Sequence, residues 1–248
     1  MSGGNISSTS IEKIGIFQWF FDCLFPKECL NCGQEGGYWC SMCQSLNDYS
    51  YPEKCLHCQK TESQNGICAD CQPLYAFDGL IIATDYEEEM IGKLIRTCKY
   101  RFVKSLTLEL SLLLKIAIIN FLDLKPNNHL IDYRFFEATV IGVPLSSRRQ
   151  KWRGFNQAEL LAQYVADYCN LSFRQDLLSR VHRSPQANLN SVERLSNLKN
   201  TFQVQGEVPA LVILVDDVIT TGTTLHECAK VLKAKGAEEV WGLVVAKG

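Results

Sequence analysis

One stretch of the 248-residue chain decides its fold, Leu211-Val-Ile-Leu-Val-Asp-Asp-Val-Ile-Thr-Thr-Gly-Thr-Thr224. Five apolar residues run into two adjacent carboxylates, Asp216 and Asp217, and a Thr/Gly loop leads into a helical pattern over 223–235. This order predicts a buried strand, a polar turn and the N-terminus of a helix. Backbone N–H groups and the positive end of the helix dipole would face a bound anion, and Gly222 would let the backbone approach it closely. The two acids could accept hydrogen bonds from paired sugar hydroxyls or hold a hydrated Mg²⁺, so the stretch suits a sugar phosphate.

The same stretch resembles the signature with which type I phosphoribosyltransferases bind 5-phosphoribosyl 1-pyrophosphate (PRPP). An apolar strand, an Asp-Asp pair, two apolar residues and a Thr-Thr-Gly-Thr-Thr loop match every position of that signature. The resemblance implies that Asp216 and Asp217 hold the ribose hydroxyls of PRPP, which is bound together with Mg²⁺. It also implies that the 5′-phosphate is held by Thr220, Thr221, Gly222, Thr223 and Thr224. The alternative is an ordinary buried strand and turn of an α/β sheet, in which this ordered mixture of residue types is uncommon.

Cysteine is the outlier of the composition, with 12 residues. Four Cys-x-x-Cys pairs stand out: Cys29/Cys32, Cys40/Cys43, Cys55/Cys58 and Cys68/Cys71. Each pair can point two thiolates at one ion, and two pairs complete a tetrahedral site, so the spacing predicts two closed, structural Zn²⁺ sites. Sequential pairing is the simplest arrangement, although crossed pairing stays open, as do disulfides and redox pairs. His57 lies inside the third pair, which already supplies two thiolates, and we interpret it as a bystander.

The remaining composition fits a protein with a buried core, since 46% of the residues are apolar and 21% are charged. The formal net charge of −2 argues neither for nor against a nucleic-acid partner, so any anion site must arise from local clustering. The apolar run over 112–122 is too short for a bilayer and contains Lys115, which predicts a buried helix and no membrane insertion. No signal peptide is recognisable, and the metal-type cysteine spacing indicates a reducing compartment, so we expect a cytoplasmic protein.

Strand and helix patterns alternate along the rest of the chain and predict an α/β fold with a mostly parallel sheet flanked by helices. Strands are expected over 79–83, 139–144, 177–181, 201–204, 211–215 and 240–246. Helices are expected over 85–101, 104–122 and 223–235, with Gly236 as the last C-cap and Asn156 as the N-cap of a further helix. Pro73 breaks the chain where the cysteine pattern stops. We therefore expect three parts: a flexible N-terminus with a short helix (1–24), a double zinc ribbon (25–74) and a phosphoribosyltransferase-like domain (75–248).

A basic loop over 146–154 follows the expected strand 139–144 and carries four cations between Arg148 and Arg153. A solvated run of charge is the plain alternative. Ligands of open α/β sheets bind at the carboxyl ends of strands, so the position of this loop favours pyrophosphate binding, with Arg148 and Arg153 as candidates. Lys99, at the end of the first helical pattern of the domain, could reach the same edge or be solvated at the surface.

Further stretches are similar to the ComF family, including its GntX-like members. They include Phe25-Pro-x-x-Cys-x-x-Cys, Lys99-Tyr100, Val143-Pro-Leu and Arg153-Gly-Phe-Asn-Gln157, in the order that the family shows. The resemblance implies a zinc ribbon fused to a type I phosphoribosyltransferase domain and a link to DNA uptake during natural transformation. Type I enzymes carry a mobile covering loop where this chain has residues 182–200, so the resemblance makes Arg183 and Arg194 candidate lid cations.

Two classes of function follow from these features. The first is an enzyme that transfers the phosphoribosyl group of PRPP to a small nucleobase-like molecule or another acceptor, by electrostatic stabilisation and exclusion of water. The second is a non-catalytic protein that senses PRPP or binds single-stranded DNA. Trp39 and Tyr38 would then offer stacking surfaces or, alternatively, pack beside the first zinc site. Other DNA-uptake proteins are expected partners of either class.

Overall fold

The computed structural model describes residues 27–45, 54–60, 63, 66–101, 103–123, 135, 137–181 and 201–248. Its contacts divide the chain into two compact units, Met1–Asp48 and Tyr49–Gly248. The predicted domain limits near residues 25 and 75 stay a prediction, and the contacts place the second group of cysteines in the larger unit. The predicted N-terminal helix and the predicted lid over 182–200, with Arg183 and Arg194, lie outside the described residues.

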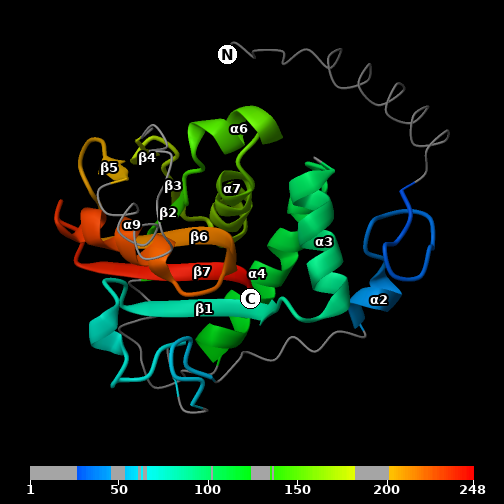
Figure 1. Cartoon of the computed structure of the whole chain (residues 1–248), viewed down its shortest axis with the longest axis horizontal. Helices are drawn as coiled ribbons and strands as arrows, with labels where there is room; N and C mark the ends of the chain where they lie inside the picture. The colour runs from blue at the N-terminus through cyan, green and yellow to red at the C-terminus, as the bar shows by residue number, and fades with distance from the viewer. Residues whose placement is uncertain are drawn as a thin grey trace, which may run out of the picture. The chain divides into compact units, whose positions relative to one another are not determined.

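The larger unit is built on a five-stranded sheet of β1 (Gly79–Asp85), β2 (Thr139–Gly142), β3 (Ser172–Phe173), β6 (Leu211–Ile219) and β7 (Glu239–Lys247) (Figure 1). The strands lie in the order β1-β7-β6-β2-β3, and every neighbouring pair is parallel. This arrangement confirms the predicted α/β class. β6 continues beyond the apolar run through both acids, because Asp216 pairs in register with Val244 of β7. The sequence prediction missed β3, a short strand at the edge of the sheet.

A second, antiparallel pair consists of β4 (Leu178–Arg180) and β5 (Phe202–Val204). Both strands were expected from the sequence, but their separate pairing was not. The pair packs against the face of the sheet that carries the last helix, because Leu178 and Phe202 join the buried cluster there. Arg180 is the last residue of β4 and faces Phe202 across the pair.

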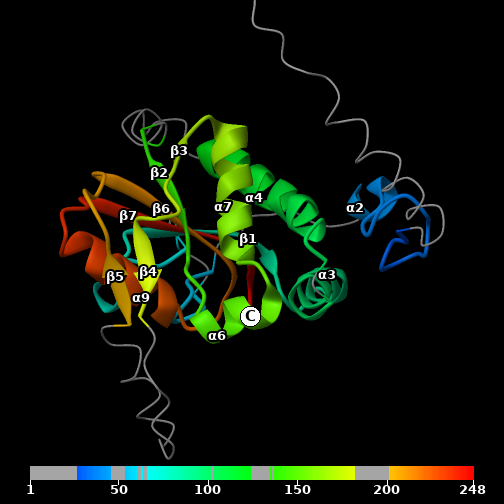
Figure 2. The ribbon, with the colours of Figure 1, turned by 90° about the horizontal axis from the view of Figure 1, so that it is seen from above.

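Helices cover both faces of the sheet, namely α3 (Glu89–Tyr100), α4 (Leu106–Asp123), α7 (Gln157–Cys169) and α9 (Thr223–Lys233). α4 and α7 pack against each other on one face, with α4 against β1 and α7 against β2 and β6. α9 lies on the opposite face (Figure 2). Asn156 caps α7 as predicted, since its side-chain oxygen accepts from the Ala158 N–H at 3.2 Å.

Two local predictions are corrected by the structure. Residues 146–154 do not form a loop, because Ser147–Arg153 is the short helix α6. Ser146 caps it by accepting from the Arg149 N–H at 3.4 Å, and Gly154 ends it with a left-handed φ of 75°. The C-cap of α9 is Ala234, with a φ of −62°, and not Gly236. The left-handed turn that needs glycine comes two residues later, where Gly236 has a φ of 113°.

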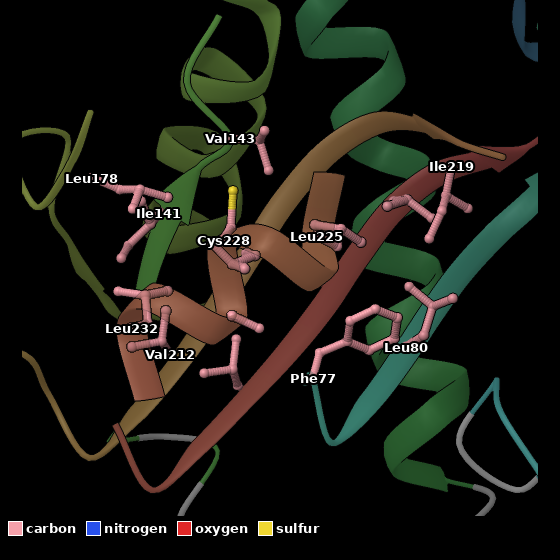
Figure 3. Close-up of a cluster of buried hydrophobic side chains, with 14 of the residues drawn as sticks. Phe77, Leu80, Ile141, Val143, Leu178, Val212, Ile219, Leu225, Cys228 and Leu232 are labelled. Carbon is pink, nitrogen blue, oxygen red and sulfur yellow. The ribbon is translucent and has the colours of Figure 1, made fainter. Parts of the chain in front are cut away.

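The core between the sheet and α9 joins parts of the chain that are far apart in sequence. Leu225, Cys228 and Leu232 of α9 meet Val212 of β6 and Leu80 of β1 (Figure 3). Successive side chains of a strand point to opposite faces of the sheet, so every second residue of these strands faces α9. The same cluster contains four residues from the second group of cysteines and their linkers: Cys55, Leu56, Ile67 and Cys71. This part of the predicted zinc ribbon is therefore built into the core of the larger unit.

Within the described part of the chain, none of the helices combines the length and apolarity that crossing a bilayer requires. α4 is the most apolar of them. It lies beside α7 on the sheet and packs against β1 and β7. One side of it is buried as the sequence predicts, whereas Leu108, Leu112 and Ile119 are exposed on the other.

Candidate functional site

The paired cysteines gather into two clusters, and in each the four Sγ atoms lie within 4.8 Å of one another. The first cysteine cluster consists of Cys29, Cys32, Cys40 and Cys43. The second cysteine cluster consists of Cys55, Cys58, Cys68 and Cys71. The knuckles therefore pair in sequential order, and His57 belongs to neither cluster.

The sulfur geometry of both clusters fits a tetrahedral metal. Four thiolates at a Zn–S distance of about 2.3 Å stand about 3.8 Å apart. The Sγ atoms of Cys32 and Cys40 are 3.6 Å apart, as are those of Cys58 and Cys68. The cysteines in the described residues form no disulfide, so the disulfide alternative does not hold for either cluster. An all-sulfur donor set of this size is the one that structural Zn²⁺ sites use.

The Thr/Gly loop, residues 220–224, joins the end of β6 to the first turn of α9. Gly222 is the N-cap of α9 with a left-handed φ of 74°, which explains the glycine. The hydroxyls of Thr221 and Thr223 lie 2.8 Å apart, within hydrogen-bond distance. A hollow of about 50 Å³ is lined by Asp216 and residues 218–225. The first N–H groups of a helix have no intrahelical acceptor, so this hollow is suited to an anion.

A larger cleft of about 270 Å³ adjoins this hollow and shares Asp216, Val218 and Thr224 with it. It lies at the carboxyl ends of β2 and β6, which are neighbours in the sheet. The chain leaves β2 through α7 to β3 and leaves β6 through α9 to β7, in opposite directions. Such a switch point opens a crevice for ligands. The charged and polar side chains of this cationic cleft are Lys99, Arg149, Arg153, Asn156, Gln157, Arg180, Asp216, Asp217 and Thr224.

The two acids sit in unlike environments. Burial, together with the neighbouring charge of Asp217, raises the pKa of Asp216 to about 7. The Asp216 carboxylate accepts from the Asp217 N–H at 2.8 Å, which opposes part of that rise. Asp217 pairs instead with Lys99, whose Nζ lies 2.9 Å from Oδ1, and the two side chains are 13% and 18% exposed. The structure thus brings Lys99 from the end of α3 into the site, rather than leaving it solvated.

The basic segment contributes to the cleft only in part. Arg149 and Arg153 line it, whereas Arg148 lies outside the lining. Arg148 and Arg149 are both exposed. Arg153 donates through Nη1 to Gln157 Oε1 at 3.0 Å. Arg153 Nε and Gln157 Nε2 are buried and have no hydrogen-bond partner in the described structure. Two buried donors of this kind are costly unless an oxygen-rich ligand accepts from them.

Arg180 is a residue of the cleft that the sequence prediction missed. Its guanidinium stacks over the Phe202 ring with 5.4 Å between Cζ and the ring centroid. Burial and the neighbouring Arg149 lower the pKa of Arg180, as expected for cations gathered in a half-buried cleft. The available signal was a cation at the end of an expected strand, immediately before the predicted lid.

The exposed aromatic residues beside the cleft are not the ones that the stacking hypothesis named. Trp39 is only 4% exposed, which supports its packing beside the first cysteine cluster. Tyr100 and Trp152 are 58% and 56% exposed, and their rings meet edge to face with centroids 6.1 Å apart. They follow Lys99 and precede Arg153, both of which line the cationic cleft. An exposed aromatic pair therefore stands beside residues of the cleft.

Comparison with known proteins identifies the domain that carries this site. The family described as Phosphoribosyl transferase domain matches residues 153–247. Competence protein F of Haemophilus influenzae is 34% identical over 238 residues, which are 91% of this chain and 97% of that protein. Competence protein ComFC of Streptococcus pneumoniae is 31% identical over 206 residues, 81% of this chain and 84% of that protein. The DNA utilization protein YhgH of Salmonella typhi is 40% identical over 108 residues, 42% of this chain and 48% of that protein. The chain belongs to the ComF family and carries a phosphoribosyltransferase domain.

Proposed function

We propose that this ComF-family protein binds PRPP with Mg²⁺ and transfers its phosphoribosyl group while serving DNA uptake in the cytoplasm. The observation that carries the proposal is the junction of β6 and α9. There, Asp216 lies between a small hollow with helix N–H groups and a larger cleft lined by cations. A molecule with a phosphate at one end, a pair of hydroxyls in the middle and a pyrophosphate at the other end matches that order.

The parts of PRPP are assigned by chemistry. The 5′-phosphate takes the hollow of the Thr/Gly loop, Thr220 to Thr224, and the ribose hydroxyls donate to Asp216 and Asp217. The pyrophosphate lies in the cationic cleft, where Arg153 Nε and Gln157 Nε2 gain acceptors for their unpaired N–H groups. Arg148, exposed on α6, and the lid cations Arg183 and Arg194 remain candidates for contacts made on closure.

Transfer breaks the bond between ribose C1 and pyrophosphate oxygen and forms a bond from C1 to the acceptor, which then loses a proton. Positive charge grows on the ribose ring and negative charge on the departing pyrophosphate. The carboxylates of the acidic pair stabilise the first, and Arg149, Arg153 and Arg180 the second. Lys99 pairs with Asp217, so once the sugar hydroxyls bind that carboxylate the ammonium group would be available to the pyrophosphate. Mg²⁺ bound together with PRPP would neutralise further charge on the pyrophosphate.

The names of the relatives support the proposed role in DNA uptake. Two are competence proteins and one is a DNA utilization protein. The two cysteine clusters would each hold one structural Zn²⁺ through four thiolates, which requires a reducing compartment.

Calorimetry with PRPP and Mg²⁺ tests the central part of the proposal. The wild type should bind, and the double variant Asp216→Asn/Asp217→Asn should bind about a hundredfold more weakly, because charge-assisted hydrogen bonds to the ribose are lost. Asp176→Asn is the matched control, since that exposed carboxylate pairs with Arg174 away from both hollows. Absence of binding by the wild type would overturn the proposal. Release of pyrophosphate with candidate acceptors would then separate transfer from sensing.

Binding of single-stranded nucleic acid is a second candidate function, favoured by the exposed pair Tyr100 and Trp152. Exposed cations stand next to both in sequence, at Arg101 and Lys151. Aromatic faces combined with backbone-neutralising cations are how sequence-tolerant single-strand sites are built.

An oligonucleotide titration tests this second function. Trp152→Ala should weaken binding about tenfold, whereas Tyr168→Ala, a part-exposed aromatic on α7, should not. Affinity should fall steeply as salt rises. Equal affinity of the two variants, or binding that ignores salt, would count against this role.

A further inference from the structure

The second cysteine cluster packs directly against the Thr/Gly loop of the same unit. Leu56, inside the Cys55–Cys58 knuckle, and Tyr75 approach Gly222 so closely that a Cβ there would stand 3.0 Å from a carbon of each. Two separate features therefore require glycine at position 222: its left-handed φ and the closeness of these neighbours. The cysteine knuckle therefore packs against the loop at Gly222.

Tyr75 links the cluster to the loop by a hydrogen bond as well as by packing. Its hydroxyl donates to the Thr221 carbonyl at 3.2 Å and lies 3.5 Å from His57 Nδ1. Its ring lies against the fully buried Phe77, with centroids 4.9 Å apart. The single 3-10 turn η1 (Gln72–Leu74) separates Tyr75 from Cys71, so the last sulfur ligand and the contact to the loop are joined by a short, structured link.

Two further bonds attach this region to α9, which follows the loop, and to β7, the neighbour of β6 in the sheet. The Ala76 N–H donates to His226 Nδ1 at 3.0 Å, in the first turn of α9. Lys247, at the end of β7, donates to Gln59 Oε1 at 2.6 Å. Leu56 and Leu225 also share one buried cluster. The second cysteine cluster and the residues that follow it are thus attached to α9 and β7 as well as to the loop.

We propose that the second cysteine cluster positions the Thr/Gly loop for a sugar 5′-phosphate, with Leu56 and Tyr75 as the positioning residues. The inference rests on the proposed function, because it concerns how the loop that takes the phosphate is held. Preorganised loops bind phosphate more tightly, since the entropy of ordering the backbone is spent during folding and not on binding. Neither positioning residue touches the ligand. Their effect is confined to the loop and does not extend to the cationic cleft.

Tyr75→Phe is the sharpest test, because it removes only the hydroxyl that bonds the Thr221 carbonyl. Tyr38→Phe, the same change beside the first cysteine cluster, is its matched control. Calorimetry with two probes, ribose 5-phosphate and magnesium pyrophosphate, separates the loop from the cleft. We expect Tyr75→Phe to weaken ribose 5-phosphate threefold to tenfold, the scale of one neutral hydrogen bond, and to leave pyrophosphate unchanged. Equal weakening of both probes, or of neither, overturns the inference.

Amide hydrogen exchange over 220–226, without ligand, keeps the test independent of the proposed function. Exchange in this segment should be faster in Tyr75→Phe than in the wild type and Tyr38→Phe, while zinc content stays the same. Unchanged exchange contradicts the positioning role whether or not either probe binds. A wild type that binds neither probe, with faster exchange in Tyr75→Phe, would remove the proposed function and leave the structural coupling standing.

Discussion

The two cysteine clusters share one spacing and one geometry but differ in what surrounds them. In each, two sulfurs from facing knuckles are 3.6 Å apart. The first lies in the small unit, beside the buried Trp39 and with Met42 of its helix α2 (Ser41–Ser45) 57% exposed. The second contributes Cys55, Leu56, Ile67 and Cys71 to the core of the phosphoribosyltransferase unit. The same four-cysteine motif thus lies in a small unit of its own in one place and is part of a phosphoribosyltransferase-type core in the other.

The largest contrast should come from one sulfur ligand in each cluster. Cys58→Ser should destabilise the larger unit by more than about 4 kcal/mol, because a metal ligand is lost beneath a shared core. Cys32→Ser should leave the unfolding of that unit unchanged. Denaturation followed by circular dichroism checks this, since most helices and strands belong to the larger unit. Equal destabilisation by the two variants would mean that the clusters are not structurally distinct.

An apolar pair sharpens the same comparison without touching a metal ligand. Leu56→Ala should cost about 2–4 kcal/mol, because it opens a cavity between the knuckle, Tyr75 and Gly222. Met42→Ala, at the exposed position of the first cluster, should cost less than about 0.5 kcal/mol. Chemical denaturation midpoints at constant slope give both values. If Leu56→Ala lowered the stability as little as Met42→Ala, the second cluster would not be part of the core of the larger unit.

The smallest contrast is in the pH dependence of stability, which Asp216 should affect only in the larger unit. Since the pKa of Asp216 is raised to about 7, the folded chain keeps this proton between about pH 4 and 7, where the unfolded chain has lost it. The contribution of Asp216 to stability therefore falls as pH rises through this window. Asp216→Asn cannot ionise, so at pH 8 it should be more stable than the wild type by roughly 2 kcal/mol, a value reduced for partial solvent screening.

Stability curves of the two proteins from pH 4 to 8 check this prediction. The difference should shrink toward pH 4, where the folded chain holds the proton and the unfolded chain approaches its own pKa of 3.8. A constant difference across the range would contradict it. The unfolding of the first cluster's unit should show no such dependence on residue 216.

The fold and the centre of the site could be predicted where the residues that form them are close together in the sequence. The strand, acids, loop and helix over 211–233 follow one another, and the Cys-x-x-Cys spacing needs only a turn. The sequence could not show whether Lys99 and Arg180 belong to the site, because their distance to Asp216 depends on how α3 and β4 pack. The helical state of α6 was missed because its charged residues carry no apolar periodicity. The joining of the second cluster to the core was missed because Leu56 and Tyr75 meet Gly222 across more than half the chain.

The most direct test of the central claim is a crystal structure of the chain with PRPP and Mg²⁺. We predict the 5′-phosphate in the hollow of the Thr/Gly loop, the ribose hydroxyls on Asp216 and Asp217, and the pyrophosphate in the cationic cleft beside Arg153 and Gln157. Leu56 and Tyr75 should keep their contacts with the loop. An unoccupied junction of β6 and α9 at saturating PRPP, or a pyrophosphate seated in the Thr/Gly loop, would contradict the account.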